Sequence, residues 1–362
     1  MKLVKLFLIS LFCLIPYSLQ AMDHTKPLML QDKFYKEYWE EHFLFDDGTF
    51  VTAQFLVANF PWPVGKEHGI MLATVVTPDG KRTIIKNGRN FGEWGFDAHK
   101  FDIFIHNHWL KSKDGVYEFY MAAGDKSKVT NRVTSAIAPL DHARFENKAG
   151  QLESSFYLPY FEGEGTWQIF QDIDKPLKAG AGKVQGFATH VVINGRLEGL
   201  LKGWLRMSGL RGNDDQPVPF LSAMTRADGT EDIILTLKSG KADLTKFTEV
   251  KLDYKDIING DDRSSSPTRI DVKARNGKET VTGTIHFKRK IDHFNISDHL
   301  NFFEGSFAAS RASVTNYRYI ADYDLIYTTE GGESQHLTGQ ALSEYADILP
   351  PKREKKKKRR RR

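Results

Sequence analysis

Two histidines two residues apart, His106 and His108, are the clearest candidates for metal chemistry in this sequence. Residues two apart on a β-strand share a face, so both imidazoles would point the same way and could bind one metal ion. A zinc site needs a third ligand, and no spacing in the chain locates one. Phe104 and Leu110 would share the same face, which favours ordinary packing. The sequence therefore predicts neither a bound metal nor another cofactor.

Two carboxylates have the same spacing on either side of Tyr323. Asp322 and Asp324 could share a proton or bind calcium, although such a pair more often belongs to a solvated sheet surface. The sequence contains no Gly-x-Ser-x-Gly elbow, phosphate-binding loop, cysteine-based metal motif or dinucleotide fingerprint. The common enzyme classes that depend on these motifs are thereby excluded, and we assign no catalytic residue.

Tryptophans and one arginine are the candidates for contact with a ligand. Trp39, Trp94, Trp109 and Trp204 lie in predicted strands or next to turns. A buried indole supplies a large apolar area with one donor, which suits a ligand-binding wall and a hydrophobic core equally. Arg206 lies in a predicted strand and could bind a carboxylate or phosphate headgroup; the alternative is an outward-facing arginine in a surface salt bridge.

Short strands joined by tight turns must position these residues. Asp-Gly, Asn-Gly and Gly-Gly pairs tolerate the positive φ angles of tight hairpins, and they recur along the chain. These pairs are Asp47-Gly48, Asp79-Gly80, Asp114-Gly115, Asn194-Gly195, Asp228-Gly229, Asn259-Gly260, Asn276-Gly277 and Gly331-Gly332. Aromatic and β-branched residues flank them, and only 245–258 and 297–303 have a weak helical pattern. The sequence therefore predicts an all-β protein of antiparallel barrels or sandwiches.

The first residues resemble a secretion signal. Lys2 and Lys5 precede an apolar run over 6–15, which predicts a signal peptide at residues 1–21 and an exported protein, periplasmic or secreted. The single cysteine, Cys13, lies within this predicted signal. We therefore expect no disulfide in the mature chain, whose stability must come from its hydrophobic core.

Composition divides the rest of the chain into two halves and a tail. Small residues within 175–185 predict a boundary between one β-domain at 22–178 and a second at 183–349, followed by a disordered basic tail at 350–362. The net charge is +5, but Lys352 to Arg362 carry +9 and the two signal lysines +2, so the remainder carries −6. The tail could bind an anionic membrane or lipopolysaccharide, and the alternative is a solvated tail without a partner; no specific nucleic acid partner is expected.

Short motifs spread over the chain resemble those of AttH-like proteins and carotenoid hydratases. Glu37-Tyr38-Trp39-Glu40, ahead of a hairpin, resembles their opening strand. Residues 101–109, in which Asn107 stands two before Trp109, are similar to their strand that ends in Asn-x-aromatic. His190-Val191-Val192 resembles the start of their second half, and 339–344 resembles their closing strand. The match spans nearly the whole predicted mature chain.

The resemblance implies two lipocalin-like β-barrels in tandem, with an apolar cavity for an isoprenoid, polyketide or lipid. The candidate ligand-binding residues are then Trp39, Trp94, Asn107, Trp109, His190, Trp204 and Arg206. Enzymes of this family hydrate a carotenoid double bond or guide cyclisations, and the hydratases carry an acid and a histidine in the second half. The matching stretch here, 202–210, has neither, which argues against hydratase chemistry.

Three functions remain open, because a fold does not fix a function. The first is a non-catalytic carrier that holds an apolar molecule inside a barrel. The second is a hydro-lyase or isomerase acting on an isoprenoid or polyketide, in which Asp322, Asp324, Glu344 or His190 replaces the missing acid. The third is an envelope-interaction module, with the basic tail as its electrostatic tether to anionic lipid.

Overall fold

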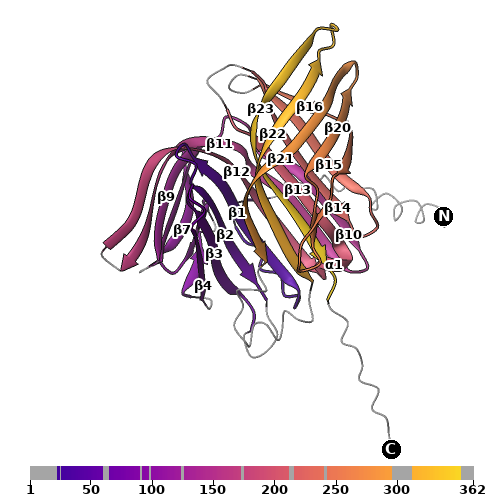
Figure 1. Cartoon of the computed structure of the whole chain (residues 1–362). Coiled ribbons are helices and arrows are strands. Elements are labelled where there is room, and N and C mark those ends of the chain that lie inside the picture. The colour runs from indigo at the N-terminus through magenta and orange to yellow at the C-terminus, as the bar shows by residue number, and fades with distance from the viewer. Residues whose placement is uncertain are drawn as a thin grey trace, which may run out of the picture.

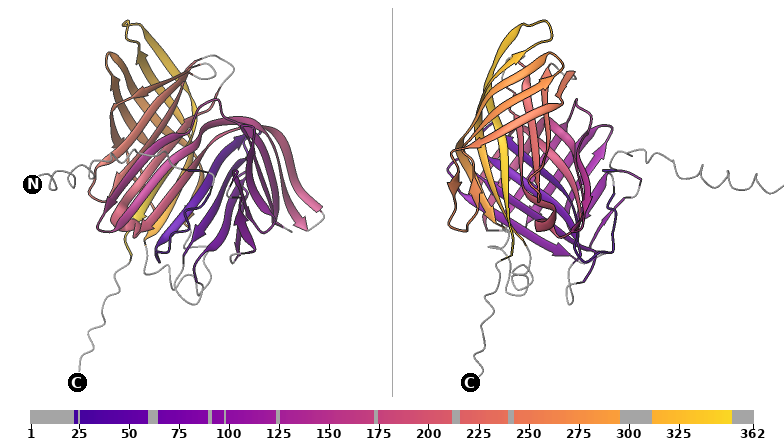
Figure 2. Two further views of the ribbon diagram at one scale, coloured as in Figure 1. Left: turned by 180° about the vertical axis from the view of Figure 1, so that it is seen from behind. Right: turned by 90° about the vertical axis from the view of Figure 1, so that its right-hand side faces the viewer.

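Two nearly closed antiparallel sheets lie side by side in the computed structural model of the chain (Figures 1 and 2). The structure describes residues 23–24, 26–59, 65–89, 92–97, 99–123, 126–172, 175–211, 216–239, 243–295 and 312–351. The predicted all-β fold of two barrels in tandem is confirmed. The predicted signal peptide, Cys13, the window 297–303 and the basic residues from 352 onward lie outside the described residues.

The first sheet contains the strands coloured indigo to magenta in Figure 1, in the order β4-β3-β2-β1-β12-β11-β9-β8-β7-β6-β5, with β10 paired to β11. Its strands are β1 (Tyr35–Phe45), β2 (Phe50–Ala58), β3 (His68–Val76), β4 (Arg82–Arg89), β5 (Trp94–Phe96), β6 (Asp102–Ile105), β7 (His108–Lys113), β8 (Val116–Ala123), β9 (Ser127–Thr134), β10 (Leu140–Asn147), β11 (Gly150–Asp172) and β12 (Lys175–Gly195). The last two form a long, bent hairpin. Along it, β11 pairs with β10 near its start and with β9 near its end.

The second sheet has the order β16-β15-β14-β13-β23-β22-β21-β20-β17. Its strands are β13 (Leu201–Gly209), β14 (Val218–Arg226), β15 (Glu231–Ser239), β16 (Asp243–Phe247), β17 (Glu249–Lys255), β20 (Arg269–Asn276), β21 (Glu279–Asn295), β22 (Ser313–Thr328) and β23 (Ser334–Leu349). A separate pair, β18 (Ile258–Asn259) and β19 (Ser265–Ser266), lies between β17 and β20.

The chain passes from the first sheet to the second at α1 (Leu197–Leu200), a single helical turn between β12 and β13. The stretch 175–185, where the sequence predicted the boundary, belongs to β12 and pairs with β11. Small residues suggested a linker there, but a sheet accepts them where a strand lies flat against its neighbours. No helix among the described residues is long and apolar enough to cross a membrane.

Most of the predicted turn pairs lie where one strand turns into the next. Gly80 and Gly115 have φ angles of 81° and 77° and lie in the β3–β4 and β7–β8 hairpins. The exception is Asn194-Gly195, which ends β12 ahead of α1. The weak helical pattern at 245–258 was misleading, because these residues form the end of β16, β17 and β18. Alternating side chains on a half-buried sheet produced that pattern.

The two histidines His106 and His108 do not share a face, contrary to the sequence expectation. His106 is exposed in the turn between β6 and β7, with a φ of 57°, whereas His108 begins β7 and is fully buried. The expectation failed because the strand reverses between them. His108 Nε2 lies 3.0 Å from Asn87 Nδ2 of β4, and this contact helps to close the first barrel. Burial lowers the pKa of His108 to about 4.

The outer faces of the central strands pack against each other between the two sheets. Phe156 of β11 meets Phe220 of β14 edge-to-face, with ring centroids 4.7 Å apart. His142 of β10 lies 3.0 Å from the carbonyl oxygen of Asp232 in β15. Because β1 lies at this junction, one of its faces lines the first barrel and the other is covered by the second sheet. A polar residue on either face must therefore find its partners inside the protein.

Candidate functional site

Strand β1 carries buried ionisable residues on both of its faces. Glu37 and Glu41 point into the first barrel among Tyr35, Trp39 and Phe43, whereas Glu40 and His42 point toward the second sheet. Charged groups are rarely buried without a partner, because removing them from water is costly. The four residues therefore define two regions of buried charge, one inside the first barrel and one at the junction between the two sheets.

The first interior cluster is centred on Glu37. Its Oε1 lies 2.8 Å from His190 Nε2 of β12, and its Oε2 accepts hydrogen bonds from the Tyr35 hydroxyl and from the Leu28 backbone N–H at 2.7 Å. The Tyr35 hydroxyl also accepts from the backbone N–H of Met29 at 3.1 Å. Burial, followed by the charge of Glu37, holds the pKa of Tyr35 well above its usual range.

The cluster continues from His190 to His24. The two Nδ1 atoms are 3.3 Å apart, and the Ser155 hydroxyl oxygen lies 3.3 Å from His24 Nδ1. Burial, and then the charge of His190, lowers the pKa of His24 to about 4. Trp39 donates from Nε1 to the His24 carbonyl at 2.9 Å. Two of the predicted ligand-binding residues, Trp39 and His190, are thus brought together in the first barrel.

The chain ahead of β1 covers this end of the barrel. Asn59 Nδ2 donates to the Leu30 carbonyl at 2.8 Å, and Met29 and Leu30 pack against the interior core. Met29 has a φ of 53°, which costs an L-residue roughly 1–2 kcal/mol. The backbone of this segment thus supplies hydrogen bonds to Glu37, Tyr35 and Trp39 at the same time as it closes the barrel.

The second interior cluster consists of Glu41, Asn131 and Tyr157, and sequence analysis missed it. Asn131 of β9 donates from Nδ2 to Glu41 Oε2 at 2.9 Å. Burial raises the pKa of Glu41 to about 7, because only this hydrogen bond opposes the loss of solvation. Burial, and then the charge of Glu41, holds the pKa of Tyr157 well above its usual range. Glu41 therefore exchanges a proton near neutral pH, which is unusual for a carboxyl group.

Three buried oxygens in this second cluster have no hydrogen-bond partner among the described residues. They are Glu41 Oε1, Asn131 Oδ1 and the Tyr157 hydroxyl. Aromatic rings surround Tyr157, with Phe101 at 5.4 Å and Tyr117 at 5.9 Å between centroids. Buried polar atoms in native proteins are nearly always satisfied, so these three have hydrogen-bonding capacity left for a guest in an apolar interior.

Arg206, Trp204 and Glu344 meet Glu40 at the junction between the sheets. Arg206 Nη1 lies 3.0 Å from Glu40 Oε2 and 3.4 Å from Glu344 Oε2, and Trp204 donates to the same Glu344 oxygen at 2.9 Å. Burial acts to raise the pKa of Glu40, but the charge of His42, its hydrogen bond and the charge of Arg206 outweigh it and lower the pKa to about 2. Arg206 is completely buried, so neither a headgroup contact nor an outward-facing salt bridge describes it.

The carboxylates Glu40 and Glu344, with His42 between them, have the geometry of a metal site, since one ligand atom from each lies within 4.8 Å of the others. The Arg206 guanidinium already contacts both carboxylates. Arg318 extends the network from Glu344 at 3.3 Å to Asp292 at 2.9 Å. The positive charge that a cation would supply therefore comes from arginine, and the cluster joins the two sheets.

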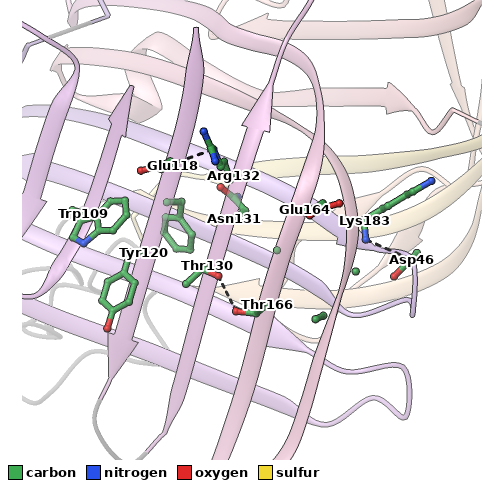
Figure 3. Close-up of a pocket in the computed structure, with 14 residues that line it drawn as sticks. Asp46, Trp109, Glu118, Tyr120, Thr130, Asn131, Arg132, Glu164, Thr166 and Lys183 are labelled. Carbon is green, nitrogen blue, oxygen red and sulfur yellow. Dashed lines mark hydrogen bonds and ion pairs between the residues drawn. The ribbon is translucent and has the colours of Figure 1, made fainter. Parts of the chain in front are cut away.

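The remaining candidates lie apart from these clusters. Trp94 is buried at one end of the first barrel, where its Nε1 donates to the Glu67 carbonyl at 2.8 Å. Asn107 is exposed in the β6–β7 turn and donates to the Ala122 carbonyl at 3.0 Å. Trp109 lies on the outer face of the first sheet beside an open groove (Figure 3). Asn107 and Trp109 thus lie outside the interior that contains Trp39 and His190, whereas Trp94 belongs to the same interior core.

Asp322 and Asp324, proposed as replacements for the missing acid, lie on the outer face of the second sheet. Asp324 Oδ1 lies 2.7 Å from Nε2 of the exposed His336. Both carboxylates line a shallow hollow of about 390 Å³ with His286 and Gln340. Of the four replacements considered, only His190 is inside the first barrel, and Glu344 is held by two arginines.

A sequence signal for the missed residues exists in β1. The run Glu37 to His42 contains four ionisable residues on alternating and adjacent positions, in a strand that aromatic residues flank at Tyr35 and Phe45. A strand with one solvated face would carry its charges on every second residue. Charges on both faces instead indicate a strand that is covered on both sides.

Comparisons with known proteins agree at the level of the fold. No family model matches the sequence, and no curated protein is similar to it in sequence. An AttH-like protein from Nitrosomonas europaea has a similar structure, with a TM-score of 0.52 and 13% identity over 90% of this chain and 96% of that one. CghA in complex with Sch210972 has a TM-score of 0.58 and 8% identity over 88% and 89% of the two chains.

Kievitone hydratase from Nectria haematococca matches with a TM-score of 0.53 and 10% identity over 86% of this chain and 88% of that one. Each of the three matches extends over nearly the whole chain, so it includes both sheets. The resemblance seen in the sequence motifs is therefore a resemblance of fold. This chain has the two-barrel, lipocalin-like fold of AttH-like proteins, CghA and kievitone hydratase.

Proposed function

We propose that this protein binds a small, mostly apolar molecule inside the first barrel and transfers a proton to it from Glu41. The observation that carries the proposal is the set of three buried oxygens on Glu41, Asn131 and Tyr157 that lack partners among the described residues. An apolar interior with a few convergent polar groups is the usual environment of a small-molecule site. A substrate oxygen could accept hydrogen bonds from the Tyr157 hydroxyl and from protonated Glu41, while a substrate hydroxyl could donate to Asn131 Oδ1.

Glu41 has the properties that a general acid needs. Its pKa of about 7 leaves a substantial fraction protonated at neutral pH, and a general acid works best when its pKa is close to the working pH. Protonation of an alkene or a carbonyl oxygen would leave a Glu41 carboxylate, which Asn131 Nδ2 already stabilises by a hydrogen bond. Glu41 lies in the first half of the chain. It would take the place of the acid that the resembling hydratases carry in the segment matched here by 202–210.

The Glu37–His190 pair is the second proton-exchanging group of the same barrel. Glu37 and Glu41 are four residues apart on one strand face, which separates their Cα atoms by about 13 Å. Trp39 lies between them and stacks on His190. For a hydration, His190 would take a proton from the attacking water as Glu41 gives one to the alkene, so the net reaction adds one water.

Two structural neighbours favour a hydro-lyase or isomerase over other reaction classes. Kievitone hydratase is named for adding water, and CghA is known in complex with Sch210972. Isoprenoids and polyketides, the compound classes that the sequence resemblance implies, are the substrates to test first. The carrier function remains the second candidate, because the same apolar interior would hold a ligand without any proton transfer.

Incubation of the purified protein with such compounds, followed by mass spectrometry, tests the proposal. We expect either a product heavier by one water or an isomer of unchanged mass. The variant Glu41→Gln should bind the compound and fail to convert it, whereas Glu118→Gln, a change on the outer sheet face, should convert it normally. Binding without turnover in all three proteins would favour the carrier, and absence of binding in all three would refute both functions.

A further inference from the structure

The outer face of the first sheet carries an open groove, whose lining also includes two residues that belong to the barrel interior, Phe119 and Asn131. It crosses strands β7, β8, β9, β11 and β12 and has a volume of about 660 Å³ (Figure 3). Small-molecule sites commonly occupy roughly 300–1,000 Å³. The groove opens to solvent on the side of the sheet opposite to Glu41 and Glu37.

Small side chains line the middle of this groove. Thr166 of β11 and Ala181 of β12 are directly opposite each other and exposed on the outer face. Gly165 and Gly182 beside them face the barrel interior, where a Cβ atom at Gly165 would lie 3.1 Å from the Phe45 ring. Ala181, from the small-residue stretch that suggested a linker in the sequence, therefore leaves this part of the outer surface low.

Two aromatic rings form one side of the groove. Trp109 of β7 and Tyr120 of β8 are directly opposite in the sheet, with centroids 5.3 Å apart and planes 11° from parallel. Lys111 Nζ lies 4.0 Å from the Trp109 ring centroid and also pairs with Glu118, so a ligand that stacks on this face of the ring would displace Lys111. Among the described tryptophans, Trp109 alone is not buried.

A row of alternating charges runs across the same strands beside the aromatic pair. Register places Lys111 opposite Glu118, Glu118 opposite Arg132, Arg132 opposite Glu164, and Glu164 opposite Lys183. Glu118 lies 3.3 Å from Lys111 and 3.7 Å from Arg132. Donors and acceptors therefore alternate along the groove, and the charges nearly cancel.

Hydroxyl groups complete the lining between the rings and Ala181. The Thr130 and Thr166 hydroxyl oxygens are 2.8 Å apart and lie next to Tyr120 in Figure 3. The groove thus offers an aromatic surface, hydroxyls, carboxylates and cations within one row of strands. It lacks the single-sign charge that steers a strongly ionic partner.

We propose that this groove binds a neutral oligosaccharide. A pyranose ring has an apolar face of C–H groups, which stacks on an aromatic ring, and a rim of hydroxyls that both donate and accept hydrogen bonds. Trp109 and Tyr120 match the first feature, and the alternating row of Glu118, Arg132 and Glu164 matches the second. Apart from Asn131, which lines the groove and also contacts Glu41, the site lies outside the proposed catalytic interior and adds a binding activity to it.

A glycan array probed with the full-length protein, followed by calorimetry with the best soluble oligosaccharide, tests this proposal. We expect saturable binding of neutral glycans and a change in tryptophan emission on binding. Trp109→Ala should weaken binding by about tenfold or more and abolish the emission change. Ile326→Ala, a truncation of an apolar residue 48% exposed on the second sheet, should leave both unchanged.

Three results would overturn the proposal. The first is no saturable binding of any neutral glycan by the wild-type protein. The second is equal affinity of the wild type and a Trp109→Ala variant whose circular dichroism and melting temperature are unaltered. The third is binding limited to sulfated or otherwise anionic glycans and lost with salt, which would assign the groove to charge-driven contacts instead.

Discussion

The indole of Trp39 lies flat against the imidazole of His190, with ring centroids 4.2 Å apart and planes 16° from parallel. The two residues are directly opposite each other on β1 and β12. His190 is also held at its edges, because its two nitrogens contact Glu37 and His24. The imidazole is therefore held on one face and at both nitrogens, which is the fixed geometry that the proposed proton transfer requires.

Replacement of His190 by phenylalanine should keep the stack on Trp39 and remove one partner of Glu37. We expect a loss of stability of about 1–3 kcal/mol, because a buried acceptor then lacks a donor. Chemical denaturation measures the change. His336→Phe is the matched control, since His336 and its partner Asp324 are both more than 60% exposed, and its effect should stay within about 0.5 kcal/mol. Equal effects of the two variants would contradict this account of Glu37.

Glu41 should make stability fall as the pH rises. Its pKa is raised from 4.5 to about 7, so the folded state binds more protons than the unfolded state between these values. Stability should therefore be fully present below about pH 4.5 and decline as pH rises through about 7, by about 3 kcal/mol in total. Comparison of Glu41→Gln with the wild type by denaturation at several pH values isolates this contribution. A constant difference across the range would contradict the raised pKa.

Arg206 should be essential to the junction of the sheets. Its change to methionine leaves Glu40 and Glu344 buried without their shared cation, which should cost about 3–5 kcal/mol. Arg226→Met is the control, because Arg226 makes a two-bonded contact with Asp232 at the surface and is 33% exposed. That contact should contribute about 1 kcal/mol or less. Thermal melts of the two variants provide the comparison.

Gly115 tests the turn chemistry that identified the hairpins. Its φ of 77° is unfavourable for an L-residue, and an added Cβ would meet nothing within 4 Å. Gly115→Ala should therefore lose roughly 1–2 kcal/mol through the backbone alone. Gly88→Ala, at an ordinary φ with its nearest atom 3.7 Å away, should cost less. The reverse order of the two denaturation midpoints would count against a left-handed turn.

The hairpins were predictable because their cause is local. Asp114-Gly115 and Asn276-Gly277 determine their own φ angles, and the strands beside them pair with their nearest neighbours in sequence. The change of sheet was not predictable in the same way, since β12 pairs with β1 at a separation of about 150 residues. The composition of 175–185 shows only that its side chains are small, and small side chains occur both in linkers and in strands such as β12.

The candidate site was only partly predictable from the sequence. Trp39 and His190 were identified, but Glu41 was not, because its importance comes from Asn131 and Tyr157 on strands distant in sequence. Arg206 was identified with the wrong surroundings for the same reason. An arginine in a strand reads as exposed until the acid that neutralises it, here Glu40 in the other sheet, is located.

The two-sided character of β1 also bears on whether either half could exist alone. Glu40 belongs to the first sheet and finds its counter-ion, Arg206, in the second, while Arg206 has no other carboxylate within reach than Glu344 among the described residues. A gene fragment that ended at α1 would lack Arg206 and leave Glu40 with His42 as its one partner from the charged cluster. The complementary fragment would keep the Arg206–Glu344 pair but expose the apolar surface that packs against the first sheet. Duplication or exchange of a single barrel would therefore require a new partner for Glu40 and a new cover for that apolar surface.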